Sequence, residues 1–163
     1  MGWLHQLQRE KRIIGNQKKA IRHLSKSHYI AHTEPRMKSL GLLKLEDQHL
    51  LQNAALAHDI INKHCPTNIH DHLDLRTDSH SYSLRSVSDN PLGLREILSN
   101  KKQIRMCFSS LGPKIWNSIP ENIKEIKNRK SFKKQLKKHL LSGYTDHLTC
   151  DNPLCRDRRH HVH

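Results

Sequence analysis

An uninterrupted helical pattern over residues 45–63 constrains the fold of this chain more than any other sequence feature. Apolar side chains recur on one wide face of this segment, and neither Gly nor Pro occurs between Leu45 and Pro66. An amphipathic helix must bury such a face against another element. We therefore expect a core helix that packs against the first helix of the chain. Its apolar face comprises Leu50, Leu51, Ala54, Ala55, Ala57, Ile60 and Ile61.

The supply of apolar residues for a core is thin. Hydrophobic residues make up 34% of the 163 residues, and the aromatic ones are two Trp, three Tyr and two Phe. Soluble domains hold about 45–50% apolar residues when Gly is counted with them. The length allows about one domain. We therefore expect a mostly α-helical, small and partly disordered assembly that depends on a neighbour, and no large enzyme core.

The N-terminal part predicts a series of short helices. Apolar spacing predicts one over residues 4–14, which Gly15-Asn16 is expected to end, and a second over about 18–25. Thr33-Glu34-Pro35 has the residue types of a helix start, with Thr33 as the cap. Gly41 is the matching stop signal.

The periodic pattern fades after Cys65 and returns only near residue 106. We expect a long polar loop over 65–105, a short strand over 106–108 and a single helical turn within 112–120 that anchors Trp116 and Ile119. The predicted organisation is a basic helical segment (1–64), a polar linker (65–105), a segment with the Gly-Pro motif and a basic helix (106–143), and a disordered Cys/His tail (144–163).

The charge balance points to a polyanionic partner. The chain carries 29 Lys and Arg against 15 Asp and Glu, a net charge of +14 with His neutral, and its pI is about 9.9. Residues 1–40 hold 9 basic and 2 acidic side chains, and residues 101–163 hold 15 and 5, whereas 41–100 are mildly acidic. Basic ends of this kind suit RNA, DNA or an anionic surface.

The clearest basic surface lies on an amphipathic helix that we expect Ser131 to cap and Gly143 to end. Phe132, Leu136 and Leu140 recur at i, i+4 and i+8 on its apolar face. Lysines on the other side could neutralise phosphates and release counterions, without reading base sequence. The predicted nucleic-acid-binding residues are Lys127, Arg129, Lys130, Lys133, Lys134, Lys137 and Lys138.

No constellation with the spacing of an active site occurs in the chain. A paired Asp-Asp for metal-assisted phosphoryl transfer, a Gly-rich phosphate loop and a nucleophile elbow are all absent from the sequence. We expect no enzymatic activity and no cofactor. Two interpretations of the end of the chain stay open: a zinc site or a disordered tail. The residues concerned are Cys150, Cys155, His160 and His163.

Targeting signals are likewise missing. The chain has no apolar run of the length of a membrane span and no apolar core of a signal peptide near Met1. These absences predict an intracellular protein, nuclear or cytoplasmic, that does not use a membrane. Free thiols are the expected state of the cysteines.

The order of several motifs resembles the region downstream of the palm in reverse transcriptases of long interspersed elements, which are non-LTR retrotransposons. The resemblance covers about residues 4–144. The segments that carry it are Leu7-Gln8-Arg9-Glu10-Lys11-Arg12-Ile13-Ile14, His32-Thr33-Glu34-Pro35, Leu40-Gly41-Leu42-Leu43-Lys44-Leu45-Glu46-Asp47, His80-Ser81-Tyr82-Ser83-Leu84-Arg85, Gly112-Pro113-Lys114-Ile115-Trp116-Asn117-Ser118-Ile119-Pro120 and Ser131-Phe132-Lys133-Lys134-Gln135-Leu136-Lys137-Lys138.

The resemblance implies the C-terminal part of a larger polymerase that copies element RNA into DNA. In that family the catalytic aspartates lie upstream, in a Phe/Tyr-Ala-Asp-Asp motif that this chain does not contain. The resemblance therefore implies a region that is inactive by itself and contacts RNA or DNA weakly. It also implies that the apolar helix faces would pack against the missing polymerase domain. A non-enzymatic module that docks a protein through leucine-rich helices, and a relic reading frame without selected function, are the alternatives.

Overall fold

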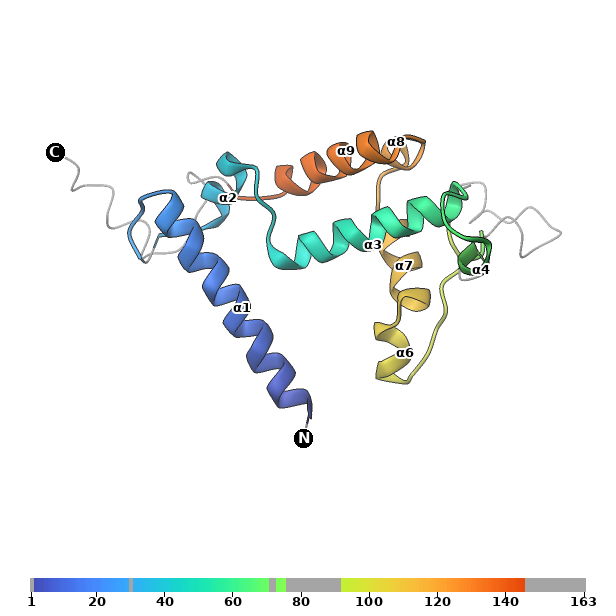
Figure 1. The fold of residues 1–163 in the computed structure, drawn as a ribbon, viewed down its shortest axis with the longest axis horizontal. Coiled ribbons are helices and arrows are strands. Elements are labelled where there is room, and N and C mark those ends of the chain that lie inside the picture. The colour runs from blue at the N-terminus through green and yellow to red at the C-terminus, as the bar shows by residue number, and fades with distance from the viewer. Residues whose placement is uncertain (1, 30, 71–72, 76–91, 146–163) are drawn as a thin grey trace. The chain divides into compact units, whose positions relative to one another are not determined.

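The protein is mostly α-helical, as the sequence predicts. The computed structural model describes residues 2–29, 31–70, 73–75 and 92–145, which form eight helices and no strand beyond an isolated antiparallel bridge between Leu75 and Leu94. These helices are α1 (Gly2–Leu24), α2 (Glu34–Leu40), α3 (Leu45–Ile61), α4 (Thr67–His70), α6 (Lys102–Met106), α7 (Phe108–Asn117), α8 (Glu121–Lys124) and α9 (Arg129–Ser142) (Figure 1).

The described residues belong to two compact units. One comprises residues 1–48 together with 138–163, and the other comprises residues 49–137. The division falls inside α3 and α9. Each unit has buried apolar side chains of its own.

In the first unit, α1 continues through the site where a break was predicted. It runs unbroken from Gly2 to Leu24, so the prediction that Gly15-Asn16 ends a helix is wrong (Figure 1). A glycine inside a helix costs only about 1 kcal/mol. The flanking Gln17 offsets part of that cost, because its Nε2 donates to the carbonyl oxygen of Leu43 at 2.9 Å and its Oε1 accepts from the backbone N–H of Leu45 at 3.2 Å.

Three helices end in the same hydrogen-bonded reversal, in which a residue with positive φ follows the helix. The three residues are Lys26 (φ 48°), Gly41 (φ 63°) and Lys63 (φ 56°). After α2, the N–H of Gly41 bonds the carbonyl of Lys38 and the N–H of Leu42 bonds that of Met37. This is the Schellman arrangement, which satisfies carbonyls that the helix leaves open. Gly41 confirms the predicted stop.

The start of α2 agrees with the prediction in position only. Thr33 occupies the N-cap position and Pro35 lies in the first turn, but the Thr33 side chain makes no capping hydrogen bond. Met37 of the same helix is buried, with 2% of its surface exposed. Burial of this methionine, rather than a side-chain cap, therefore fixes α2 in the first unit.

In the second unit, five of the seven apolar positions predicted for the α3 core are buried, and Leu50 and Ile61 are half-buried. Leu51, Ala54, Ala55, Ala57 and Ile60 of this helix are all buried. From the C-terminal part of the chain, Trp116, Ile119, Phe132 and Leu136 are buried as well. The rings of Trp116 and Phe132 stack with their centroids 5.9 Å apart. The anchoring roles predicted for Trp116 and Ile119 are confirmed.

The region around residue 107 is helical rather than extended. Met106 ends α6 and Phe108 begins α7, so the predicted strand over 106–108 is wrong; only Cys107, between the helices, has an extended backbone. The turn predicted at Gly112 is instead the middle of α7, which contains Pro113. A Cβ on Gly112 would lie 2.9 Å from the Phe108 ring, so the glycine makes room for that ring.

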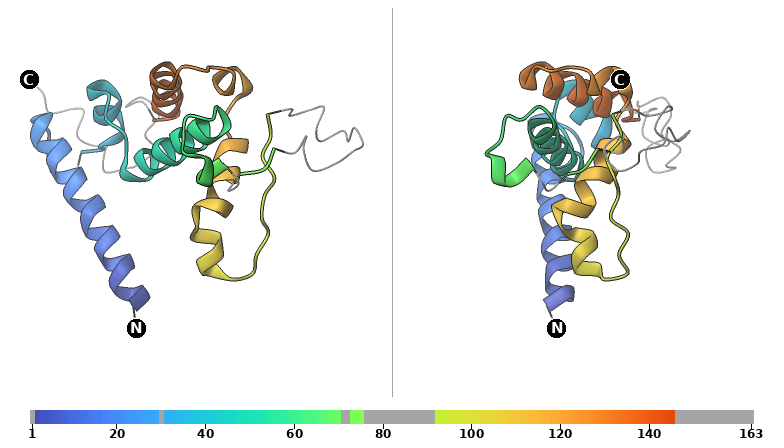
Figure 2. Two further views of the ribbon diagram at one scale, coloured as in Figure 1. Left: turned by 45° about the vertical axis from the view of Figure 1, so that its right-hand side comes forward. Right: turned by 90° about the vertical axis from the view of Figure 1, so that its right-hand side faces the viewer.

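The segment before α6 is extended and runs alongside α7 (Figure 2). Asn117 holds it by pairing with both backbone groups of Leu94, accepting from its N–H at 2.9 Å and donating to its carbonyl at 3.0 Å. The indole N–H of Trp116 donates to the carbonyl of Leu92 at 2.8 Å. Two residues of the Gly-Pro-containing motif thus tie part of the predicted linker to the core. The linker also contains α4 and α6, so it is not a continuous loop where the structure describes it.

Candidate nucleic-acid interface

Helix α9 is fixed by a cap at its first turn and by two buried side chains. The cap is Asn128 and not Ser131, which is exposed: Asn128 Oδ1 accepts from the N–H groups of Lys130 at 3.0 Å and Ser131 at 3.1 Å. Phe132 and Leu136 are 0% and 1% exposed. Because these two anchors set the rotation of the helix, they also decide which basic side chains face water.

Four of the seven predicted contact residues are exposed lysines. Lys127 precedes the helix, and Lys130, Lys134 and Lys138 recur within α9 at i, i+4 and i+8, on one side of it. Four residues correspond to about 6 Å along a helix, so the charges follow one another in a row. Within the described residues of the second unit, Lys127, Lys130 and Lys134 form no ion pair. These side chains are available to phosphates.

The other three predicted residues have partly structural environments. Lys133 and Lys137 are half-buried, and the Nζ of Lys133 lies 3.4 Å from Oε1 of Gln52 on α3. Arg129 is 56% exposed, but its Nε donates to Oδ2 of the nearly buried Asp59 at 2.9 Å. Sequence spacing could not reveal these partners, because Gln52 and Asp59 lie far away along the chain.

Lys124 also differs from its neighbours along the chain. It belongs to the run of basic residues that ends at Lys138, but only 5% of it is exposed. Because Lys124 is buried in α8, it does not belong to the exposed basic surface, whose first residue is Lys127. The basic surface consists of Lys127, Lys130 and Lys134 in the second unit, and Lys138 continues the row within α9.

Helix α1 is a second basic element and belongs to the first unit. Arg9, Lys11, Arg12, Lys18 and Lys19 are all exposed, whereas Ile21 is buried. Among the side chains of α1 whose burial the structure describes, residues 8–24, Ile21 is the buried one. This part of the helix therefore presents mostly charged and polar side chains to solvent.

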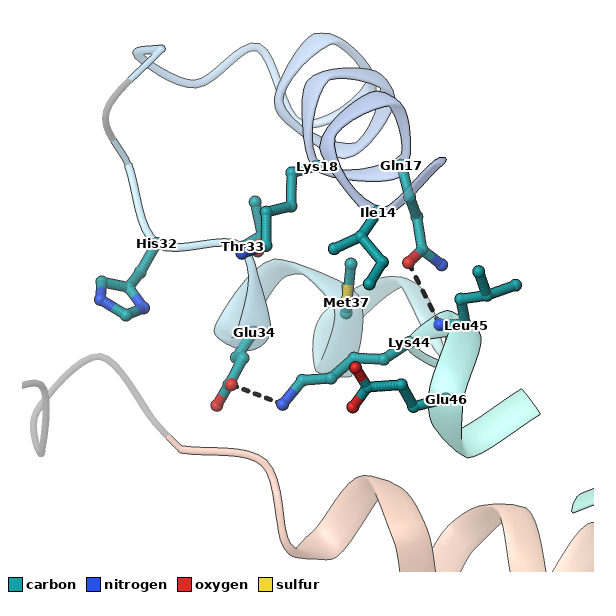
Figure 3. A pocket seen from close by; sticks show the side chains of 10 residues that line it. All are labelled: Ile14, Gln17, Lys18, His32, Thr33, Glu34, Met37, Lys44, Leu45 and Glu46. Carbon is teal, nitrogen blue, oxygen red and sulfur yellow. Dashed lines mark hydrogen bonds and ion pairs between the residues drawn. The ribbon is translucent and has the colours of Figure 1, made fainter. Parts of the chain in front are cut away.

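A pocket of about 240 Å³ lies in the first unit, between α1 and α2 (Figure 3). Glu34 on its wall is engaged by Nζ of Lys44 at 2.5 Å and by the hydroxyl of Thr145 at 2.7 Å. These donors hold the pKa of Glu34 near 2, below its usual 4.5. The Glu34 carboxylate thus holds Thr145 and Lys44 together, while Glu46, which also lines the pocket, is exposed.

Tyr144 completes this polar cluster. Its hydroxyl donates to Oδ2 of Asp47 and accepts from the backbone N–H of Lys44 at 2.7 Å, while Nζ of Lys44 lies 4.8 Å from the centre of its ring. Burial, and then the bond to Asp47, raise the pKa of Tyr144. The network joins residues near both ends of the first unit and has a structural role.

One group of potential metal ligands was not predicted. His58, Asp59 and His64 lie at the C-terminal end of α3, a segment that the sequence pattern assigns to the core alone. The four tail residues of the zinc prediction, Cys150, Cys155, His160 and His163, lie outside the described residues. Within those residues, Cys65 and Cys107 are free thiols, as expected.

The chain was compared with protein-family models, curated proteins and solved structures, and none of them matches it. No helix in the described part of the chain combines the length and the apolar character that a bilayer crossing requires.

Proposed function

We propose that this chain is the region downstream of the palm in a retrotransposon-derived reverse transcriptase, and that it contacts RNA or DNA through phosphates without reading base sequence. The observation that carries the binding proposal is the row of exposed lysines on α9, whose rotation Phe132 and Leu136 fix. Fixed cations of this kind bind a polyanion by releasing its counterions.

Two of the segments that carry the resemblance pack against each other. Trp116, from the Gly-Pro-containing motif, stacks on Phe132, from the basic helix, and Asn117 of the same motif binds the backbone of Leu94. The Gly-Pro-containing motif and the basic helix thus contribute to one core. In this proposal they position a basic helix, and polymerisation requires the catalytic aspartates of an upstream palm.

Charge reversal on this surface tests the binding proposal. We compare Lys127→Glu/Lys130→Glu/Lys134→Glu with a matched triple variant of exposed lysines elsewhere, Lys26→Glu/Lys101→Glu/Lys114→Glu. Both changes lower the net charge equally. Affinity for fluorescent RNA and DNA oligonucleotides of two unrelated sequences is measured as a function of salt. Each phosphate contact contributes a slope of about 0.7 to 0.9 in the double-logarithmic plot.

We expect the first triple variant to reduce that slope by about 2 and the control to change it by much less. Equal slopes for the two variants would show that only net charge matters and would refute the assignment of the site. Sequencing of the transcript 5′ end tests the family assignment separately: an in-frame Phe/Tyr-Ala-Asp-Asp segment upstream supports it.

Exposed apolar side chains favour the alternative, a protein-docking module. Leu24 is 67% exposed and Leu98 is 87% exposed. Solitary exposed leucines are normal on protein surfaces, so they carry less weight than the lysine row. Salt-insensitive association with a protein, together with no binding to either oligonucleotide, would favour this alternative.

A further inference from the structure

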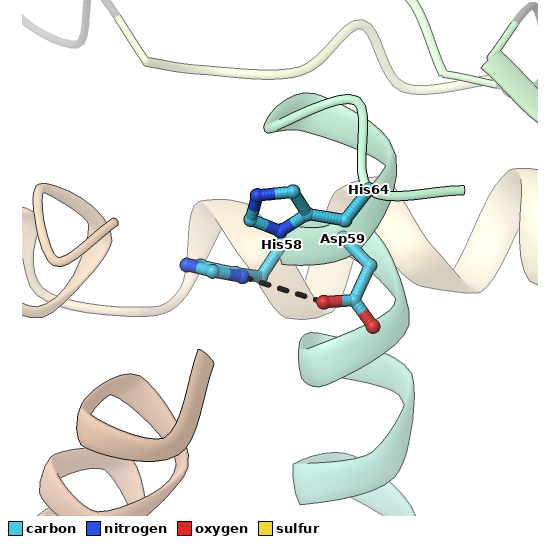
Figure 4. A group of neighbouring side chains, drawn as sticks. All are labelled: His58, Asp59 and His64. Atoms are coloured by element: carbon cyan, nitrogen blue, oxygen red, sulfur yellow. Dashed lines mark ion pairs between the residues drawn. The ribbon is translucent and has the colours of Figure 1, made fainter. Parts of the chain in front are cut away.

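The C-terminal end of α3 brings together three side chains that have the donor atoms of a metal site. One ligand atom from each of His58, Asp59 and His64 lies within 4.8 Å of the other two (Figure 4). His58 is 0% exposed and the Asp59 side chain 10%, whereas His64 is exposed. The group therefore has two buried members and one that faces solvent.

The backbone reversal after α3 creates this grouping. The N–H of His64 bonds the carbonyl of Asp59 at 2.8 Å, and the N–H of Lys63 bonds that of Ile60 at 3.1 Å. This is the Schellman arrangement, with Lys63 at positive φ. It turns the chain back over the last helical turn, so His64 comes to lie beside residues 58 and 59.

Hydrogen bonding fixes which nitrogen of His58 has a lone pair. Its Nε2 lies 2.7 Å from the carbonyl oxygen of Ile126, which can only accept, so Nε2 carries the proton. In the neutral ring Nδ1 is then an acceptor. It faces Oδ1 of Asp59 at 3.7 Å, and both atoms are buried without a hydrogen-bond partner.

Two buried acceptors that face each other without a donor are costly. A cation between them would satisfy both. In a tetrahedral zinc site with bonds of about 2.0–2.1 Å, ligand atoms are about 3.3 Å apart, so the separation of Nδ1 and Oδ1 needs to change by only a few tenths of an ångström. The ring of His64, being exposed, can rotate to close the remaining distance.

The outer contacts of the two buried ligands are those that metal sites use to orient their ligands. His58 donates its other ring N–H to a backbone carbonyl, and Asp59 receives Nε of Arg129 on Oδ2 at 2.9 Å, which leaves Oδ1 for an ion. We propose that His58 Nδ1, Asp59 Oδ1 and a ring nitrogen of His64 bind one divalent transition-metal ion, of which Zn²⁺ suits this donor set. Water would fill the fourth position.

Zinc titration of the full chain tests this site. Cys150→Ser/Cys155→Ser serves as the background for all measurements, so that the tail thiols do not bind the metal. In this background, His64→Ala is compared with His139→Ala, the substitution of another exposed histidine. Zn²⁺ affinity is measured by competition with a chromogenic chelator, and circular dichroism verifies that each variant is folded.

We expect one equivalent of Zn²⁺ in the background protein, an affinity loss of more than about 100-fold in His64→Ala, and none in His139→Ala. Equal affinity of these two variants would overturn the proposal. So would the absence of a tight equivalent in the background protein.

Nitrogen-15 NMR of the histidine rings distinguishes a bound metal ion from the alternative, which is a proton on Nδ1 of His58. Direct binding shifts the Nδ1 resonance of His58 when Zn²⁺ is added. A proton on Nδ1 that persists in excess Zn²⁺ would instead identify an ion pair with Asp59 and refute the site. Neither outcome depends on nucleic-acid binding, so this proposal and the proposed function can fail separately.

Discussion

The amide of Asn117 holds the segment before α6 through three hydrogen bonds, and Asn117→Asp replaces it with a group of the same shape. Two of these bonds use Nδ2, which donates to the Leu94 carbonyl at 3.0 Å and to Oε1 of Glu96 at 2.9 Å. The introduced carboxylate cannot donate, so an oxygen would face both acceptors. The third bond, from the Leu94 N–H to Oδ1 at 2.9 Å, can persist.

The magnitude follows from the two lost bonds. A hydrogen bond to a carbonyl contributes about 1 kcal/mol and one to a charged group about 1.5–3 kcal/mol. Because Asn117 is half-buried, solvent screens part of the new repulsion. We expect the free energy of unfolding to fall by about 3 kcal/mol at neutral pH, a large part of the 5–15 kcal/mol that is typical of a domain.

Urea denaturation measures this loss. Trp116, adjacent to the substitution and 1% exposed, reports by its fluorescence in a Trp3→Phe background. Glu96 and the Leu94 carbonyl should raise the pKa of the introduced carboxyl above its unfolded value. Its protonated form is therefore favoured in the fold, and the deficit should shrink as the pH falls toward about 4. A loss below about 0.5 kcal/mol, or a deficit that is independent of pH, would refute this reasoning.

Two further predictions concern the first unit. The pKa of Glu34 is lowered from 4.5 to about 2, so its contribution to stability is present above pH 4.5 and lost as the pH falls toward 2. After allowance for solvent around the pair, Glu34→Gln should lower the free energy of unfolding by about 1 kcal/mol at neutral pH and not at all near pH 2. Urea titrations at the two pH values measure this difference. At the helix ends, Gly41→Ala should lower the free energy of unfolding by about 1 kcal/mol because the residue has a positive φ. A steric clash does not contribute, since no atom lies within 4 Å of the added Cβ. Lys26 also has a positive φ, so Lys26→Gly should raise the free energy of unfolding by about 0.5 kcal/mol. Thermal unfolding of both variants checks this pair, and an equal sign for the two changes would contradict the explanation.

The helical class and much of the core could be predicted from the amino-acid sequence alone. Apolar spacing placed the helix that begins at Leu45, and it identified Trp116, Phe132 and Leu136 as buried residues. Gly41 was recognised as a helix stop, and its positive φ is the reason. Each of these features depends on neighbours within a turn or two of helix, which is the range over which periodicity carries information.

Local signals were misleading where tertiary contacts outweighed them. Gly15 suggested a break, but α1 continues and Gln17 binds the backbone of Leu43 and Leu45. Residues 106–108 suggested a strand, but helices α6 and α7 meet there. A glycine costs a helix only about 1 kcal/mol, so a few contacts from distant residues can reverse the local preference.

The chemical environment of individual side chains depends on contacts between distant parts of the chain. Arg129 belongs to the predicted basic surface, but its partner Asp59 lies on another helix, and the ring of His58 is oriented by the carbonyl of Ile126, 68 residues away. Thr145 and Glu34 meet across 111 residues. Helical periodicity records which face is apolar, but not which remote donor meets which acceptor, because that pairing forms only when the helices pack.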